Sequence, residues 1–268
     1  MGNVIKKKPL FLWTIITLIV CVALALTIDP WLTNWLKIKV SDSHAYYWRI
    51  ITDLGRAGTY LSFSFICFLC FALIVLKKNQ SEFGCSNHFC AGARNSLFVF
   101  YTLVVSGISI NIFKFVIGRQ RPKAMFEDGF YGLIPFNTNH AMNSFPSGHS
   151  QTGWALAMSL ALIFPRATPL LVTFAILVAI SRVILTVHFL SDVIAGALIS
   201  IITAVLLKRY FLDHAQTDSI TGANVTDKIV KRYGNWFLKV IFKIPWIHQS
   251  NRKNINLKSP KKRETSEL

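Results

Sequence analysis

Two histidines and an aspartate stand beside apolar segments of the sequence, where charged and titratable side chains are costly. His188 and Asp192 lie four residues apart in the stretch SRVILTVHFLSD (181–192), and His149 ends a PSGH motif. If a helix begins just before Asp192, its carboxylate can hydrogen-bond to His188, fix the imidazole tautomer and stabilise its positive charge. A histidine held in this way is a candidate nucleophile towards phosphorus, and His149 is a candidate general acid for the leaving oxygen.

Three cationic residues and a helix start could together bind a phosphate group. Lys114, Arg121 and Arg182 offer one ammonium and two planar guanidinium groups, which match phosphate oxygens. Ser147 and Gly148 stand where we expect a helix to begin, so free backbone N–H groups and the helix dipole favour an anion there. Glycine also lets the backbone approach a ligand closely. Such a set would hold a phosphate without a metal or another cofactor.

Six apolar segments must position these residues. Of the 268 residues, 53% are hydrophobic, and the mean hydropathy is +0.45, which excludes an ordinary soluble domain. Each segment can cross, or nearly cross, a hydrocarbon core of about 30 Å as a helix. The sequence therefore predicts an all-α, polytopic membrane protein with six transmembrane helices, at 10–28, 58–76, 96–117, 148–164, 167–185 and 192–207.

The distribution of Lys and Arg predicts which side of the membrane the motifs face. With both termini in the cytoplasm, the cytoplasmic parts hold 20 of the 29 Lys and Arg residues, as the positive-inside rule requires. The connections that carry the motifs then face the opposite side, which is the periplasm if the protein lies in a bacterial inner membrane. Much of the net charge of +17 lies beside lipid, so it favours anionic lipid head groups, and not nucleic acid, as a partner.

The three motifs follow one another within about 80 residues. They read K-x6-RP at 114–122, PSGH at 146–149 and SR-x5-H-x3-D at 181–192. This pattern resembles the type 2 phosphatidic acid phosphatase superfamily, which also includes the vanadium haloperoxidases and glucose-6-phosphatase. The resemblance implies a phosphatase helical-bundle core, a membrane lipid phosphate as substrate and no cofactor.

The resemblance also implies a role for each matched residue. His188 would attack phosphorus and form a phosphohistidine, with Asp192 supporting it. His149 would protonate the leaving group and later help water to attack. The residues that would hold the phosphoryl oxygens are Lys114, Arg121, Ser147, Gly148 and Arg182.

Other functions stay open on the sequence alone. His149, His188 and Asp192 could be ligands of a metal hydrolase, although the neighbouring lysine and arginines would repel a cation. The charges could also form the anion site of a transporter. Among lipid phosphatases, the sequence favours action on lipid A or undecaprenyl pyrophosphate, because the connector 123–145 carries polar and aromatic residues that could bind a sugar. Phosphatidylglycerol phosphate and phosphatidic acid are the alternative substrates.

We expect the chain to have two parts. Residues 1–210 would form the six-helix transmembrane lipid phosphatase domain, and residues 211–268 would form a basic cytoplasmic tail. Apolar residues recur at helical spacing in KIVKRYGNWFLKVIFKI (228–244), and its cations lie largely off that stripe. This segment is predicted to be an amphipathic helix that lies on anionic lipid of the inner leaflet.

Overall fold

The computed structural model describes residues 8–79, 87–139, 142–209 and 212. Contacts between residues divide the chain into two compact units, Met1–Thr217 and Asp218–Leu268. Every described residue lies in the first unit. The predicted tail helix at 228–244 lies outside the described residues.

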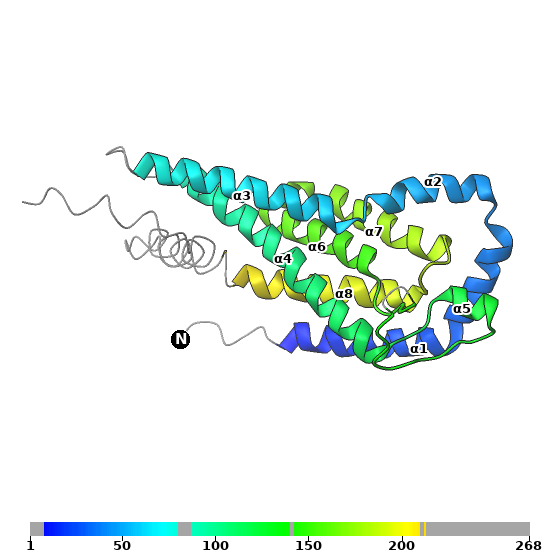
Figure 1. The fold of residues 1–268 in the computed structure, drawn as a ribbon. Helices are drawn as coiled ribbons and strands as arrows, with labels where there is room; N and C mark the ends of the chain where they lie inside the picture. The colour runs from blue at the N-terminus through cyan, green and yellow to red at the C-terminus, as the bar shows by residue number, and fades with distance from the viewer. Residues whose placement is uncertain (1–7, 80–86, 140–141, 210–211, 213–268) are drawn as a thin grey trace, which may run out of the picture. The chain divides into compact units, whose positions relative to one another are not determined.

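Helices make up almost all of the described chain (Figure 1). In chain order they are α1 (Lys8–Lys39), α2 (Asp42–Asp53), α3 (Ala57–Asn79), α4 (Asn87–Ile117), α5 (Pro122–Glu127), α6 (Gly148–Ile163), the short 3-10 helix η1 (Pro165–Ala167), α7 (Thr168–Ile184) and α8 (Leu190–Lys208). Within this described part, extended structure is limited to two isolated bridges, Arg119 with Leu133 and Gln120 with Asn143. The predicted all-α class is confirmed.

Among the described residues, five segments are long and apolar enough to cross a membrane. They are Leu10–Lys39, Asp42–Val75, His88–Ile117, Pro165–Ile184 and Leu190–Lys208. Since a hydrocarbon core requires every backbone polar group to be satisfied within the protein, helices of this kind are the natural spanning elements. The prediction of a multi-pass membrane protein is confirmed.

The remaining predicted span corresponds to α6, which has only 16 residues. At 1.5 Å per residue this helix is about 24 Å long, which is shorter than a hydrocarbon core of about 30 Å. The count of six transmembrane helices therefore stays a prediction. α6 packs against α4, α7 and α8, and its buried positions include Gly153, Ala155 and Ala157. Small residues of this kind let helices approach closely inside a bundle.

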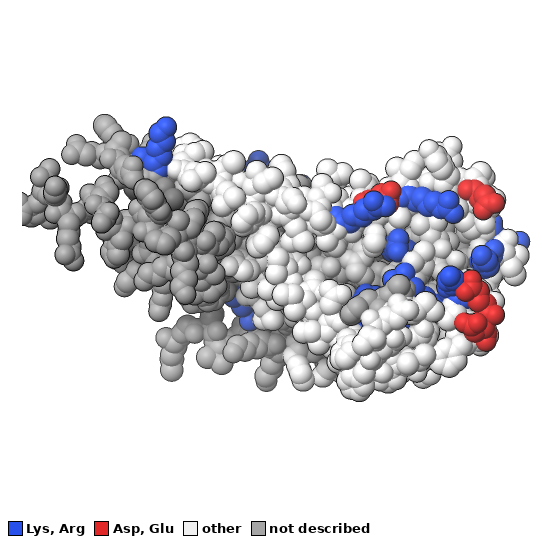
Figure 2. Space-filling model, in the orientation of Figure 1, with Lys and Arg blue, Asp and Glu red and all other residues white. Residues whose placement is uncertain are grey.

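The longer helices surround α6. In Figure 1, α4, α6, α7 and α8 run side by side, with α3 against α4 and α1 against α8. The outer helices expose large apolar side chains, such as Phe11 and Leu26 of α1 and Phe63 of α3, which suits a surface that faces lipid. On the face shown in Figure 2, charged side chains gather near α2 and α5, and the middle of the bundle is largely without them.

α1 is longer than the apolar run that predicted it. The helix continues through Pro30 to Lys39, since membrane helices tolerate proline where neighbouring groups satisfy the freed backbone. Asp29 therefore lies on a helix and not in a loop. α2 then connects α1 to α3 and packs against α7.

Two glycines allow close backbone approaches at one end of the bundle. Gly118 follows α4 with φ of +59°, and a Cβ there would lie 1.7 Å from the Ile134 carbonyl oxygen. A Cβ on Gly196 of α8 would lie 2.5 Å from the Ser147 carbonyl oxygen. The ends of α4 and α7 and the starts of α6 and α8 consequently meet at this end (Figure 1).

Candidate active site

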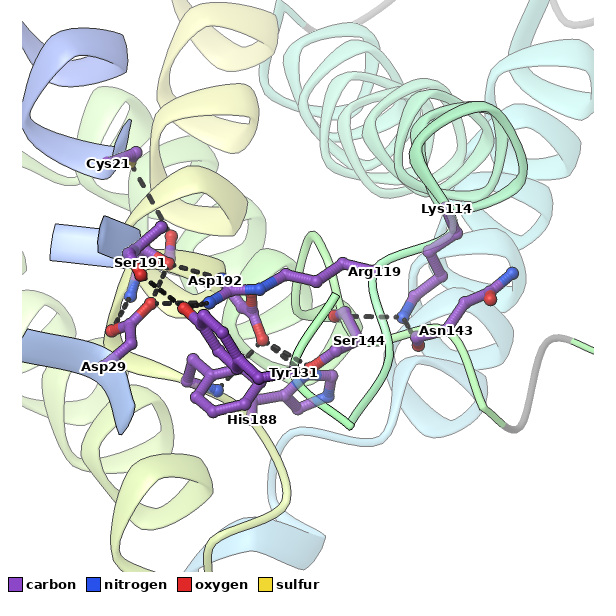
Figure 3. A network of polar contacts seen from close by, with 12 residues as sticks. Cys21, Asp29, Lys114, Arg119, Tyr131, Asn143, Ser144, His188, Ser191 and Asp192 are labelled. Atoms are coloured by element: carbon purple, nitrogen blue, oxygen red, sulfur yellow. Dashed lines mark hydrogen bonds and ion pairs between the residues drawn. The ribbon is translucent and has the colours of Figure 1, made fainter. Parts of the chain in front are cut away.

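His188 lies in the short connection between α7 and α8 and is buried. Its Nδ1 atom is 3.6 Å from Oδ2 of Asp192 and 3.2 Å from Oγ of Ser144. The Ser144 hydroxyl donates to the same Asp192 oxygen at 2.5 Å (Figure 3). Because 3.6 Å is too long for a direct hydrogen bond, the Ser144 hydroxyl is what connects the histidine to the aspartate.

This arrangement favours one tautomer of His188. The Ser144 hydrogen is directed to Asp192, so the Ser144 oxygen can accept the Nδ1–H of the imidazole. The lone pair of the ring then lies on Nε2. Asp192 is itself fixed, because its Oδ2 also accepts the backbone N–H of Phe189 at 2.9 Å, a bond that caps the start of α8.

Burial keeps His188 uncharged. It lowers the pKa of His188 to about 3; Asp192 opposes this shift, and the positive charges of Lys114 and Arg121 add to it. A neutral imidazole is the form that can act as a nucleophile. His188 is therefore uncharged at neutral pH, which is the protonation state that the predicted nucleophile would need.

Lys114, in the last turn of α4, reaches the loop that precedes α6. Its ammonium group donates to the carbonyl oxygens of Asn143 at 2.8 Å and Ser144 at 3.4 Å (Figure 3). An ammonium group has three donors, so one N–H remains for a ligand. The cation is thus anchored on the same loop that supplies the Ser144 hydroxyl.

Arg121 and Arg182 bring guanidinium groups from two different elements. Arg182 of α7 donates from Nη1 to Oγ1 of Thr52 in α2 at 2.7 Å, and Arg121 directly precedes α5. Among the described residues, Nε of each arginine and Oγ of Ser147 are buried without a hydrogen-bond partner. Buried polar atoms are almost always paired in proteins, so these three atoms indicate a binding site for a ligand rich in acceptors.

The start of α6 brings the PSGH residues to the same end of the bundle. The Ser147 N–H donates to the Asp192 carbonyl oxygen at 3.0 Å, which ties α6 to α8. A Cβ on Gly148 would meet no atom within 4 Å, so there is room for a ligand beside the first turn and its N–H groups. His149 is half-buried, and Gly55 packs against its ring.

Electrostatic interactions show that the fold brings the predicted residues together. Arg121 interacts with Lys114 and Arg182 and with both His149 and His188. Burial lowers the pKa of Arg121.

In the described part of the chain, no three His, Cys, Asp or Glu side chains form a cluster that could hold a metal ion, so the metal-hydrolase alternative finds no ligand set there.

A second buried network, centred on Arg119, was not predicted from the sequence. Arg119 donates from Nη1 to Oδ1 of Asp192 at 2.7 Å and from Nη2 to Oδ2 of Asp29 at 2.9 Å (Figure 3). The side chains of Ser191 and Tyr131 also accept hydrogen bonds from Arg119. Asp29 directly follows the first apolar run, and a carboxylate in that position was the signal that could have found the network.

The helical bundle is similar to that of a solved membrane protein. The crystal structure of the first transmembrane PAP2 type phosphatidylglycerolphosphate phosphatase from Bacillus subtilis matches with a TM-score of 0.50 and 22% sequence identity, over 75% of this chain and 94% of that chain. At this identity the likeness shows the fold alone. The chain is therefore a polytopic α-helical membrane protein with this type of bundle.

Sequence comparison bears on the family. Residues 95–216 match the model of the PAP2 superfamily, in agreement with the resemblance carried by the three motifs. Two curated relatives, both named Lipid A 1-phosphatase, are 40% identical in Rhizobium johnstonii and 39% identical in Rhizobium etli, each over 116 residues. The matches cover 42% of this chain and 48% and 50% of the relatives, so the chain spans about half the length of the curated relatives it matches.

Proposed function

We propose that this protein is a metal-independent phosphatase that removes a phosphate group from a membrane lipid. The proposal depends most on one juxtaposition at the end of the bundle. His188 is held through Nδ1 by Ser144 and Asp192, and the buried Nε donors of Arg121 and Arg182 have no hydrogen-bond partner among the described residues. A neutral imidazole beside donors that suit an anion is what transfer of a phosphoryl group requires.

The first step transfers the phosphoryl group to His188. The Nε2 lone pair attacks phosphorus and forms a P–N bond, while the P–O bond to the lipid breaks. His149 donates a proton to the leaving oxygen, and the negative charge of the bound phosphate favours the protonated form of His149 that this step needs. Asp192, acting through Ser144, stabilises the positive charge that develops on the imidazole ring.

The cationic residues stabilise the negative charge of the phosphoryl oxygens in the transition state. Lys114, Arg121 and Arg182 donate from three elements, and Ser147 and Gly148 donate from the start of α6. Because these groups already supply the positive charge, the reaction needs no metal ion. Vanadate adopts a trigonal bipyramid that resembles the transition state, so it should inhibit.

The second step releases the phosphate. Water attacks phosphorus in the phosphohistidine, and His149 accepts the proton that water loses. The P–N bond breaks, and its electron pair returns to Nε2 of His188. Inorganic phosphate leaves, and both histidines are back in their starting protonation states.

Lipid A is the substrate that we propose. The two curated relatives are Lipid A 1-phosphatases, and the connector 123–145, which leads into the start of α6, carries polar and aromatic residues suited to a sugar head group. A phosphate attached to a lipid also suits a site at the end of a transmembrane bundle. Undecaprenyl pyrophosphate, phosphatidylglycerol phosphate and phosphatidic acid are the competing substrates in the test below.

We further propose that the protein lies in an inner membrane with this site facing the periplasm. The positive-inside count supports the orientation. A cysteine that replaces exposed Lys123, in a variant without native cysteines, should react with an impermeant thiol reagent in cells whose outer membrane is permeabilised. A cysteine that replaces Lys77, which lies near the C-terminal end of α3, should react only after lysis. The reverse pattern would overturn the orientation.

The function is tested with the purified full chain in detergent against these four lipids. Phosphate release from lipid A should survive excess chelator and stop with vanadate. His188→Ala should release no phosphate and form no phosphoenzyme, whereas Lys77→Ala, which removes an exposed charge far from the site, should keep the wild-type rate. Loss of activity on chelation that zinc or magnesium restores would overturn the metal-free mechanism. Release from none of the lipids would overturn the proposed function.

A further inference from the structure

Arg119 lies buried between two carboxylates that come from the first and the last described helices (Figure 3). Its Nη1 atom is 2.7 Å from Oδ1 of Asp192 in α8, and its Nη2 atom is 2.9 Å from Oδ2 of Asp29 in α1. Both carboxylates are 0% exposed, and Arg119 is 6% exposed. One guanidinium group thus joins α1 to α8 through two buried ion pairs.

Neighbouring groups hold this guanidinium group in place. The Ser191 N–H donates to Oδ1 of Asp29 at 3.2 Å and its hydroxyl donates to Oδ2 of Asp29, while the same hydroxyl oxygen accepts from Nη1 of Arg119 at 2.7 Å. Cζ of Arg119 also lies 4.3 Å from the ring centre of Phe189 and 5.3 Å from that of Tyr131. Cation–π contacts of this length attract the guanidinium group to the two rings.

The network fixes the orientation of the Asp192 carboxylate. Burial opposes the charge of Arg119, yet the carboxylates of Asp192 and Asp29 outweigh it and raise the pKa of Arg119 above its usual value. Arg119 occupies Oδ1 of Asp192, so Oδ2 is the oxygen that accepts from Ser144 and faces His188. Rotation of the carboxylate would break both sets of contacts at once.

We propose that Arg119 and Asp29 are positioning residues for the nucleophile. Arg119 fixes the Asp192 carboxylate and Asp29 fixes Arg119, so the imidazole of His188 stays in the tautomer that leaves Nε2 free to attack. α1 lies outside residues 95–216, so the catalytic unit extends beyond the matched domain. The catalytic consequence rests on the proposed phosphatase function, but the effect on the imidazole does not.

Two conservative variants test the proposal without leaving two buried carboxylates unpaired. Asp29→Asn keeps the size of the side chain and an oxygen for Ser191 but removes the charge. Arg119→Lys keeps the charge but has no planar fork with which to reach both carboxylates. Cys21→Ala is the control, because it removes a buried side chain of α1 that contacts the Ser191 carbonyl oxygen without changing any charge in the network.

The first readout is steady-state kinetics of phosphate release from lipid A. We expect kcat to fall about 10–100-fold in Asp29→Asn and in Arg119→Lys, the range seen when a partner that orients a site ligand is lost. KM and inhibition by vanadate should change little, because the phosphate-binding residues are untouched. Cys21→Ala should keep the wild-type kcat. A wild-type kcat in both charge variants would overturn the proposal.

The second readout needs no enzymatic activity. In protein labelled with ¹⁵N in histidine, the chemical shifts of the two imidazole nitrogens of His188, assigned with His188→Ala, report the tautomer. Wild-type protein should show the Nδ1–H form, and Arg119→Lys should show a mixture of tautomers. Unchanged shifts in both Arg119→Lys and Asp29→Asn would overturn the inference. If wild-type protein releases phosphate from no lipid, the proposed function fails, and these shifts still decide whether Arg119 positions His188.

Discussion

Nδ1 of His188 and Oδ2 of Asp192 are 3.6 Å apart, a separation longer than a hydrogen bond. Oγ of Ser144 lies within hydrogen-bond distance of both atoms. The serine hydroxyl therefore carries the interaction that orients the imidazole. In the proposed mechanism, loss of this hydroxyl should impair the nucleophile and leave phosphate binding intact.

Ser144→Ala is expected to lower kcat for lipid phosphate release about 10–100-fold, as loss of an orienting partner does elsewhere. Inhibition by vanadate should persist, because Lys114 bonds to backbone carbonyls that alanine retains. Ser159→Ala is the matched control, since Ser159 is a buried serine of α6 whose hydroxyl donates only to a carbonyl one turn away. Steady-state kinetics on both variants make the comparison, and equal losses would contradict the role of Ser144.

His149→Ala should slow the reaction most for poor leaving groups. A lipid or sugar oxygen needs a proton to leave, and loss of a general acid costs about 10²–10⁴-fold in rate. The phenolate of an aryl phosphate with an acidic phenol leaves without that proton. For this substrate the rate of the phosphoenzyme burst should therefore be much less affected. Rapid-quench measurement of both substrates tests this difference. An equal loss of burst rate for both would show that His149 is not the acid.

Because His188 is buried in its neutral form, the protein should be less stable towards unfolding in acid. The pKa of His188 is lowered to about 3 by burial, whereas an unfolded histidine has a pKa of about 6.5. Between these pKa values the unfolded state binds the proton and the folded state does not. The contribution of His188 to the free energy of unfolding is therefore complete above about pH 6.5 and falls as the pH drops towards 3. His188→Asn lacks the titration. Its melting temperature should therefore fall less than that of wild type on acidification without phosphate; parallel curves would contradict the shift.

Gly196→Ala should disturb the contact between α8 and the start of α6. The new Cβ would lie 2.5 Å from the Ser147 carbonyl oxygen, and overpacking of this kind costs about 1–3 kcal/mol. The melting temperature and kcat should both fall, because the Ser147 N–H is bonded to Asp192. Gly107→Ala in α4 meets no atom within 4 Å, so it should be neutral or stabilising by about 0.5–1 kcal/mol. Equal thermal unfolding of the two variants would argue against the close approach.

Local patterns in the sequence predicted the helices and the candidate site residues, but not the long-range pairings of Arg119. The order of motifs placed His188, His149 and the three cations at one membrane face, and the structure brings them to one end of the bundle. The pairing of Arg119 with Asp29 depends on α1 packing against α8. Because that contact joins segments far apart in the chain, no spacing rule could have indicated it.

The lengths of the helices were harder to predict than their existence. Hydropathy reports which residues suit lipid, so it ended the first span at residue 28, although the helix continues to Lys39 with a more polar sequence. For α6 the apolar run 148–164 predicted the helix to within one residue, because the helix ends at Ile163 before Pro165, and a residue before proline disfavours the helical conformation. The contribution of Ser144 was missed because a serine in a loop carries no periodic signal.

The two ion pairs of Arg119 also constrain biosynthesis. The ribosome makes Asp29 first, then Arg119, and Asp192 last. Of its two carboxylate partners, Arg119 can therefore meet only Asp29 until α8 enters the bilayer. α1 can therefore complete its contacts with α8 only after the last helix has been made. A nascent chain arrested before α8 would keep Arg119 paired with one carboxylate and not two, and quality-control proteases could recognise this incomplete polar cluster.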